Sequence, residues 1–161
     1  MTTVSYPSDV VPGPPPITLD MPEGWTQVWA PETLIAIRDD AEGVDHFLAN
    51  VVVRFYQRLG SFGSEEIHAE LSEYVAQRRD GELGPLKQQA VNGREWLGSD
   101  VAFVDDQAGT IGQVHWFTGQ RRNDVMDVMD VIQVTGSYAG SRREQDYATI
   151  DAIVDTIRVN P

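Results

Sequence analysis

The feature of the sequence that most limits its possible folds is a run of strand-like segments joined by short turns between residues 86 and 135. Residues 86–91 lead into Asn92-Gly93, a pair that tolerates the positive φ angles of a two-residue hairpin turn. Residues 94–104 are then the returning strand, and residues 110–118 follow a second turn that contains glycine. Because parallel strands need long crossovers, these short turns predict an antiparallel meander of about three or four strands.

An amphipathic helix is predicted on either side of this meander. The first is expected to have Ser64 as its N-cap and to end by Gly81, with an apolar stripe of Ile67, Leu71, Tyr74 and Val75. The second is expected to begin with a capping box of Ser141 and Glu144. Its apolar stripe consists of Tyr147, Ile150, Ile153, Val154 and Ile157. Its aspartates are expected mostly on the solvent side, namely Asp146, Asp151 and Asp155.

Shorter strands are predicted before the first helix, at residues 17–21, 33–38 and 49–55, and a short edge strand is predicted at the end, at Arg158-Val159. Residues 49–55 alternate most clearly between apolar and polar side chains. The order of elements along the chain is strands, a helix, a meander and a second helix. This order predicts an α+β fold with an antiparallel sheet.

The 161 residues are enough for one domain, which we expect over residues 17–161. Residues 1–16 hold five of the nine prolines. Proline lacks the backbone N–H that a strand or helix needs, so this segment is predicted to be a polyproline-like, flexible arm. A tether is favoured over a ligand for a proline-recognising groove.

The charge balance argues against a nucleic-acid partner. Twelve lysines and arginines stand against 25 acidic residues, a net charge of −13, and the only lysine is Lys87. Such a chain repels a polyanion unless a basic patch overrides the repulsion, and the sequence shows no such patch. It also has no apolar run long enough to insert into a membrane. The sequence as given predicts a soluble cytoplasmic protein. A cell-envelope location is predicted only if a leader has been removed.

No pattern of residues predicts catalysis, a metal site or a cofactor. The absence of cysteine excludes thiolate ligands and cysteine nucleophiles. The histidines His46, His68 and His115 are scattered. Residues 136–140 and 60–63 lack the serine spacing of a nucleophile elbow and the lysine of a phosphate loop. We therefore expect no catalytic residues, no metal ligands, no cofactor and no enzyme activity.

A period-three aspartate repeat leaves one alternative open. Asp124, Asp127 and Asp130 would share one face of a helix and could attract a cation. In a strand, Asp127 would point away from the other two and the cation site would be lost. The β-branched residues that follow favour a strand, at least for the second half of the segment.

Several segments form a recognisable set. The opening Ile17-Thr18-Leu19-Asp20-Met21-Pro22-Glu23-Gly24-Trp25 is an apolar strand followed by Pro-x-Gly-Trp. Later segments of the set are Ser64-Glu65-Glu66 and the endings Val134-Thr135-Gly136-Ser137 and Ile157-Arg158-Val159. Together they resemble the mycobacterial LpqN/LpqT family, whose fold is PsbP-like (Mog-type). The resemblance implies a twisted antiparallel sheet of about six or seven strands sandwiched by helices, and a non-catalytic role in binding or assembly. The family's lipoproteins carry a leader and an acylated cysteine that this chain lacks, so membrane anchoring is not implied.

The leading functional prediction is a non-enzymatic protein-interaction or assembly module that presents an acidic surface to a basic protein partner. Trp96 and Trp116 are expected in the core. Trp29 is the best candidate for an exposed tryptophan, although a place in the core is slightly favoured for it too. The candidate partner-contact residues are Trp25, Trp29, Asp39, Asp40, Glu42 and Asp45. The alternative is a carrier of a small apolar ligand, held between the sheet and a helix in a pocket lined by Trp or Met.

Overall fold

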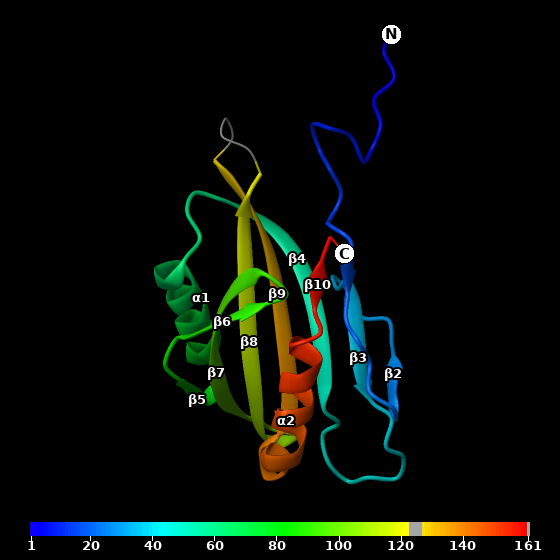
Figure 1. Ribbon diagram of the computed structural model, residues 1–161. Coiled ribbons are helices and arrows are strands. Elements are labelled where there is room, and N and C mark those ends of the chain that lie inside the picture. The colour runs from blue at the N-terminus through cyan, green and yellow to red at the C-terminus, as the bar shows by residue number, and fades with distance from the viewer. Residues whose placement is uncertain (123–126, 161) are drawn as a thin grey trace.

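The computed structural model describes residues 1–122 and 127–160. Its helices are α1 (Ser64–Ala76), the short 3-10 helix η1 (Gly140–Arg142) and α2 (Arg143–Val154). Its strands are β1 (Ile17–Thr18), β2 (Trp25–Gln27), β3 (Ile35–Asp39), β4 (Asn50–Leu59), β5 (Arg79–Leu83), β6 (Lys87–Val91), β7 (Arg94–Asp105), β8 (Gly109–Arg121), β9 (Val128–Ala139) and β10 (Arg158–Val159). Residues 1–16 contain neither helix nor strand. Their N-terminal part leads away from the rest of the molecule (Figure 1), whereas residues 12–16 lie against it, beside Phe55 and Arg94.

The strands form a large antiparallel sheet, which confirms the predicted α+β class. Eight strands take part, in the order β2-β3-β4-β9-β8-β7-β5, with β6 also paired to β7. The sheet is larger than the predicted six or seven strands, because β2 and β5 form at its two margins and neither was expected from the sequence. β1 and β10 pair with each other as a separate two-stranded ribbon.

The predicted hairpin is present in the expected register. Val91 of β6 pairs with Arg94 of β7, which leaves Asn92 and Gly93 as the two turn residues. Their φ angles are 47° and 78°, as a tight turn of this kind requires. β7, β8 and β9 continue as the predicted meander, with Asp105 paired to Gly109 at the next turn.

The helices cover opposite faces of the sheet, as predicted (Figure 1). α2 packs on a core that includes Ile132, whereas α1 packs on a smaller cluster that includes Val131. These two residues are neighbours in β9, so their side chains point to opposite faces. No helix over the described residues is both long and apolar enough to cross a membrane.

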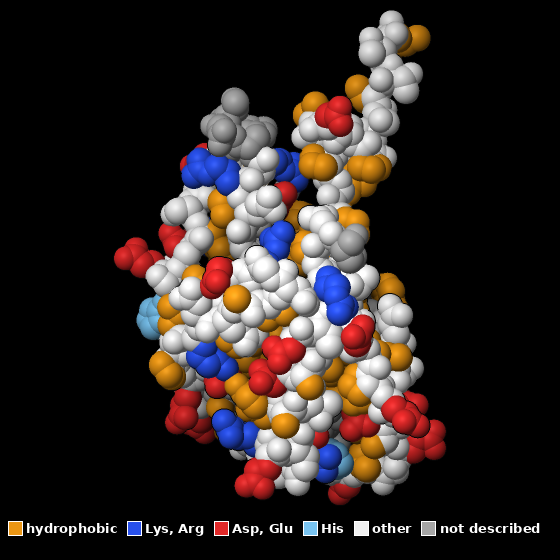
Figure 2. All heavy atoms as spheres, viewed as in Figure 1, with side chains coloured by type: hydrophobic (Ala, Val, Ile, Leu, Met, Phe, Trp, Pro, Cys, Tyr) orange, Lys and Arg blue, Asp and Glu red, His pale blue; other side chains and the backbone are white. Residues whose placement is uncertain are grey.

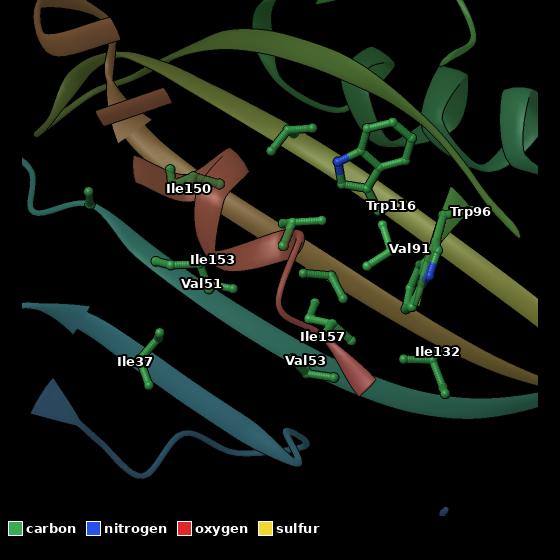
Figure 3. Close-up of a cluster of buried hydrophobic side chains, with 14 of the residues drawn as sticks. Ile37, Val51, Val53, Val91, Trp96, Trp116, Ile132, Ile150, Ile153 and Ile157 are labelled. Atoms are coloured by element: carbon green, nitrogen blue, oxygen red, sulfur yellow. The ribbon is translucent and has the colours of Figure 1, made fainter. Parts of the chain in front are cut away.

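The core beneath α2 holds most of the buried apolar side chains. Ile153 of α2 and Ile157 lie beside Val51 and Val53 of β4 (Figure 3). Trp96 and Trp116 are also buried in this core, which confirms their predicted role. The helix approaches the sheet so closely at Gly136 that an added Cβ atom would overlap Cγ2 of Ile150. Glycine is therefore needed at this point of β9.

The predicted N-cap of the first helix is wrong, and the helix ends well before the predicted limit of Gly81. Its N-cap is Gly63, whose N–H donates to the Glu66 carboxylate at 2.8 Å, and Ser64 is already helical. At the other end the helix stops at Ala76, and Arg79 begins β5. This segment pairs with the edge of β7, and Gly81 allows its backbone to pass against Val75.

The start of the second helix also differs from the prediction. Ser141 lies in η1, and the helix follows from Arg142 without the predicted capping box. The short 3-10 turn is how the chain passes directly from β9 into α2. Asp146 is buried rather than solvent-exposed, and it accepts hydrogen bonds from the Arg142 guanidinium at 3.2 Å.

Candidate functional site

The predicted partner-contact residues lie along one margin of the main sheet, where β2 and β3 form a hairpin. Trp25 pairs with Asp39 in the strand register. The N–H of Asp40 donates to the carbonyl oxygen of Gly24 at 2.8 Å, which brings this acidic residue beside Trp25 as well. Trp25 is half-buried and packs on the main core, so only part of its ring is available to a partner.

Trp29 lies beyond the other end of β2 and is 87% exposed, so its placement in the core is wrong. The structure does not bring Trp29 directly against Glu42 and Asp45, because these acids follow β3 at the opposite end of the hairpin. Trp29 follows Trp25 by four residues, so their Cα atoms are at most about 14 Å apart. That distance is within the width of an ordinary protein–protein interface.

Residues 20–45, here called the acidic edge, concentrate charge and exposed apolar side chains. The segment has seven acidic residues and one arginine, a net charge of −6 out of −13 for the whole chain. It also carries exposed large apolar side chains, namely Met21, Trp29, Leu34 and Val44. Acidic and apolar side chains lie together along this margin in Figure 2. Among the described residues, no group of three or more histidine or acidic side chains is placed to hold a metal ion.

A cavity of about 360 Å³ lies on the other side of the sheet from α2, between α1 and strands β4, β8 and β9. We call it the α1 pocket. Its lining includes no tryptophan or methionine and is dominated by polar side chains, with Tyr74 as its one aromatic ring apart from the imidazole of His115. The predicted apolar carrier site therefore finds no support in this cavity.

Strand register explains why polar side chains collect in the α1 pocket. Gln113 pairs with Ser137 and His115 pairs with Thr135, so all four face α1. Farther along the same face the residues become apolar, and they form the small cluster under Ile67 and Leu71 of α1. The sequence signal for this site is the polar alternation within β8 and β9.

His115 is the centre of a hydrogen-bond network at the base of the pocket. Its Nε2–H donates to Oε1 of Gln113 at 2.8 Å, and its Nδ1 accepts from Nε2 of Gln133 at 3.1 Å. The hydroxyl of Tyr74 donates to the same Gln113 oxygen at 2.9 Å. Burial, reinforced by the charges of Arg78 and Arg54, lowers the pKa of His115 to about 3. The imidazole is therefore neutral at pH 7.

Lys87, the only lysine, has a structural role on the opposite face. Its ammonium group donates to Asp100 at 2.8 Å and to the hydroxyl of Tyr147 at 2.7 Å. Burial opposes its protonation, but the hydrogen bonds to Asp100 and Tyr147 prevail and raise the pKa of Lys87. The three side chains join β6 and β7 to α2.

The aspartate repeat is extended in its second half, as the β-branched residues predicted, because β9 begins at Val128. Asp130 accepts hydrogen bonds from Arg122 at 3.2 Å and from Gln57 at 2.9 Å. Asp127 is exposed, and Asp124 lies outside the described residues. Of the remaining histidines, His68 is exposed on α1 and His46 is half-buried before β4.

Comparison with known proteins identifies the fold. No protein-family model and no curated protein matches the sequence. Solved structures do match. One is LpqN, involved in cell envelope biogenesis of Mycobacterium tuberculosis, which superposes with a TM-score of 0.73 at 10% sequence identity. The match covers 99% of this chain and 90% of LpqN. Cyanobacterial PsbP from Synechocystis sp. PCC 6803 gives 0.57 at 12% identity, with 97% and 98% covered. The Saccharomyces cerevisiae Ran-binding protein Mog1p gives 0.50 at 14% identity, with 89% and 90% covered. The chain has the PsbP-like fold that these proteins share.

Proposed function

We propose that the protein is a non-enzymatic binding module whose acidic edge holds a basic segment of a protein partner. The observation that carries the proposal is the 87% exposure of Trp29 within a segment of seven acidic residues and one arginine. A tryptophan side chain exposed to this degree loses the free energy that burial would supply, unless a partner covers it.

The acidic edge combines an exposed aromatic side chain with charged side chains, and in protein interfaces these two kinds of residue have different roles. A central aromatic side chain supplies much of the binding free energy, and surrounding charges set encounter rate and partner choice. Here Trp29 is the anchor at one end of the β2–β3 hairpin, and Asp40, Glu42 and Asp45 supply the charge at the other end. A lysine- or arginine-rich segment complements both, because arginine and lysine pair with carboxylates and also stack on indole rings. Residues 1–16 would then tether the module.

The structural neighbours support a binding role without assigning one. Mog1p is described as a Ran-binding protein and LpqN as involved in cell envelope biogenesis. Both statements concern those proteins, and one fold serves many functions. The partner of this chain therefore has to be identified through the acidic edge itself.

An affinity-capture experiment with surface variants tests the proposal. Full-length protein is immobilised and exposed to lysate of the native host at low and high salt. We expect recovery of a basic protein that is lost in Trp29→Ala and in the triple variant Asp40→Asn, Glu42→Gln, Asp45→Asn, and that is weakened by salt. Leu59→Ala is the matched control, since Leu59 is 78% exposed on β4, outside the acidic edge. Capture that is unaffected by both edge variants would contradict the proposal.

A further inference from the structure

The α1 pocket carries two opposite charges that do not pair with each other. Arg54 of β4 and Glu70 of α1 both line the cavity, yet the ion pairs found among the described residues, within 4.0 Å, do not include this one. Glu70 accepts from the hydroxyl of Tyr56 at 3.0 Å and 3.2 Å, and its carboxylate has further lone pairs. Arg54 forms no side-chain hydrogen bond to any residue that the structure describes. Arg54 is solvent-exposed, so its guanidinium group is accessible to a ligand at the mouth of the cavity.

Between these charges the pocket offers uncharged groups with spare hydrogen-bonding capacity. Gln133 uses its amide N–H on His115, which leaves its carbonyl oxygen free to accept. Ser137 accepts from Gln113 through Oγ, which leaves its own O–H free to donate. Asn50 donates to the carbonyl oxygen of Leu48, which leaves its side-chain oxygen free as well. The lining thus combines one cation, one anion and a neutral polar floor.

This combination discriminates between classes of ligand. A simple anion would meet the Glu70 carboxylate, and a simple cation would meet the Arg54 guanidinium. An apolar molecule would remove both charges and the amide groups from water without replacing their hydrogen bonds, which is unfavourable. A molecule with both a carboxylate and an ammonium group satisfies both ends. A volume of about 360 Å³ is within the range of small-molecule sites.

The geometry points to a second, independent site: the α1 pocket binds a small zwitterion of the amino-acid class. Arg54 takes the carboxylate, for which its planar guanidinium is suited, and Glu70 takes the ammonium group. Gln133 and Ser137 contact the remainder of the ligand. This site lies between α1 and the sheet and does not depend on the acidic edge.

Nuclear magnetic resonance titration of the full-length ¹⁵N-labelled protein tests the inference. The probes are free L-alanine, L-leucine and L-glutamine, added up to about 10 mM, where a site with a Kd of about 1 mM is about nine-tenths occupied. Propionate and ethylamine, the deaminated and decarboxylated counterparts of alanine, are titrated in parallel. We expect saturable shifts of the Gln113, His115 and Thr135 amide signals with at least one amino acid, and binding about tenfold weaker for the counterpart compounds.

Two variants localise the site. Arg54→Met and Glu70→Gln should each weaken amino-acid binding by about tenfold or more. The controls Arg121→Met and Glu73→Gln change exposed residues outside the pocket and should retain wild-type affinity. The inference is overturned if no amino acid gives a saturable shift, if propionate or ethylamine binds as well as alanine, or if either pocket variant keeps wild-type affinity. The comparison of ligands uses the wild-type protein, so it decides the question even if a variant folds poorly.

Discussion

The buried neutral histidine makes a testable contribution to acid sensitivity. Burial and the nearby arginines lower the pKa of His115 from 6.5 in the unfolded chain to about 3 in the folded one. Between these pH values the unfolded chain binds a proton that the folded protein does not. Acid therefore favours unfolding: the contribution of neutral His115 to stability is complete above about pH 6.5 and declines as the pH falls towards 3.

The size of this effect follows from the separation of the two pKa values. In the pH range where His115 is protonated only in the unfolded chain, each unit by which the pH falls lowers the free energy of unfolding by about 1.4 kcal/mol. From pH 6.5 to about pH 4.5 the loss due to this one residue is about 2 kcal/mol, because protonation is only half complete at the upper limit. This is a large share of the stability of a typical domain.

Urea unfolding followed by tryptophan fluorescence measures this loss directly. His115→Gln removes the titrating group, so the variant should lose about 2 kcal/mol less than wild type between these pH values, whatever its stability at neutral pH. His68→Gln, which changes an exposed histidine of α1, is the control and should retain the wild-type dependence. Identical pH dependence in wild type and His115→Gln, or an imidazole that titrates above about pH 5 in the folded protein, would refute the reasoning.

Two further predictions concern stability. Gly136→Ala should lower the free energy of unfolding by about 1 to 3 kcal/mol, because the added methyl group would overlap Ile150 of α2. An unchanged thermal midpoint would show that α2 does not pack closely on β9 at this position. Lys87→Met should cost about 1 to 3 kcal/mol in urea unfolding, because it leaves Asp100 and Tyr147 without their shared donor. A Lys87→Met variant as stable as wild type would contradict the role assigned to this cluster.

The elements predicted correctly are those with a strong local pattern. The turn at Asn92-Gly93 needs only two adjacent residues that accept positive φ, and the stripe of α2 needs only the spacing of its apolar residues. β5 and β2 were missed because they carry no such pattern. The sequence of β5 is Arg-Asp-Gly-Glu-Leu, and it becomes a strand only by pairing with the edge of β7. Tertiary pairing of this kind cannot be read from a short polar segment.

The two candidate sites differ in the same way. The residues of the acidic edge lie close together in the sequence, so their grouping was predictable, although the exposure of Trp29 was not. The α1 pocket gathers Arg54, Glu70 and Gln133 from elements far apart in the chain. Polar alternation in β8 and β9 was a usable signal, but it points to a cavity only once α1 is known to cover that face of the sheet.

Site-specific photo-cross-linking tests the proposed binding role of the acidic edge most directly. A photoreactive phenylalanine analogue at position 29 is compared with the same analogue at position 59, which is also highly exposed but lies outside the acidic edge. We predict that position 29 captures one basic protein in the native host and that added salt reduces the yield, while position 59 captures none. Equal capture from both positions, or none from position 29, would contradict a binding surface centred on Trp29.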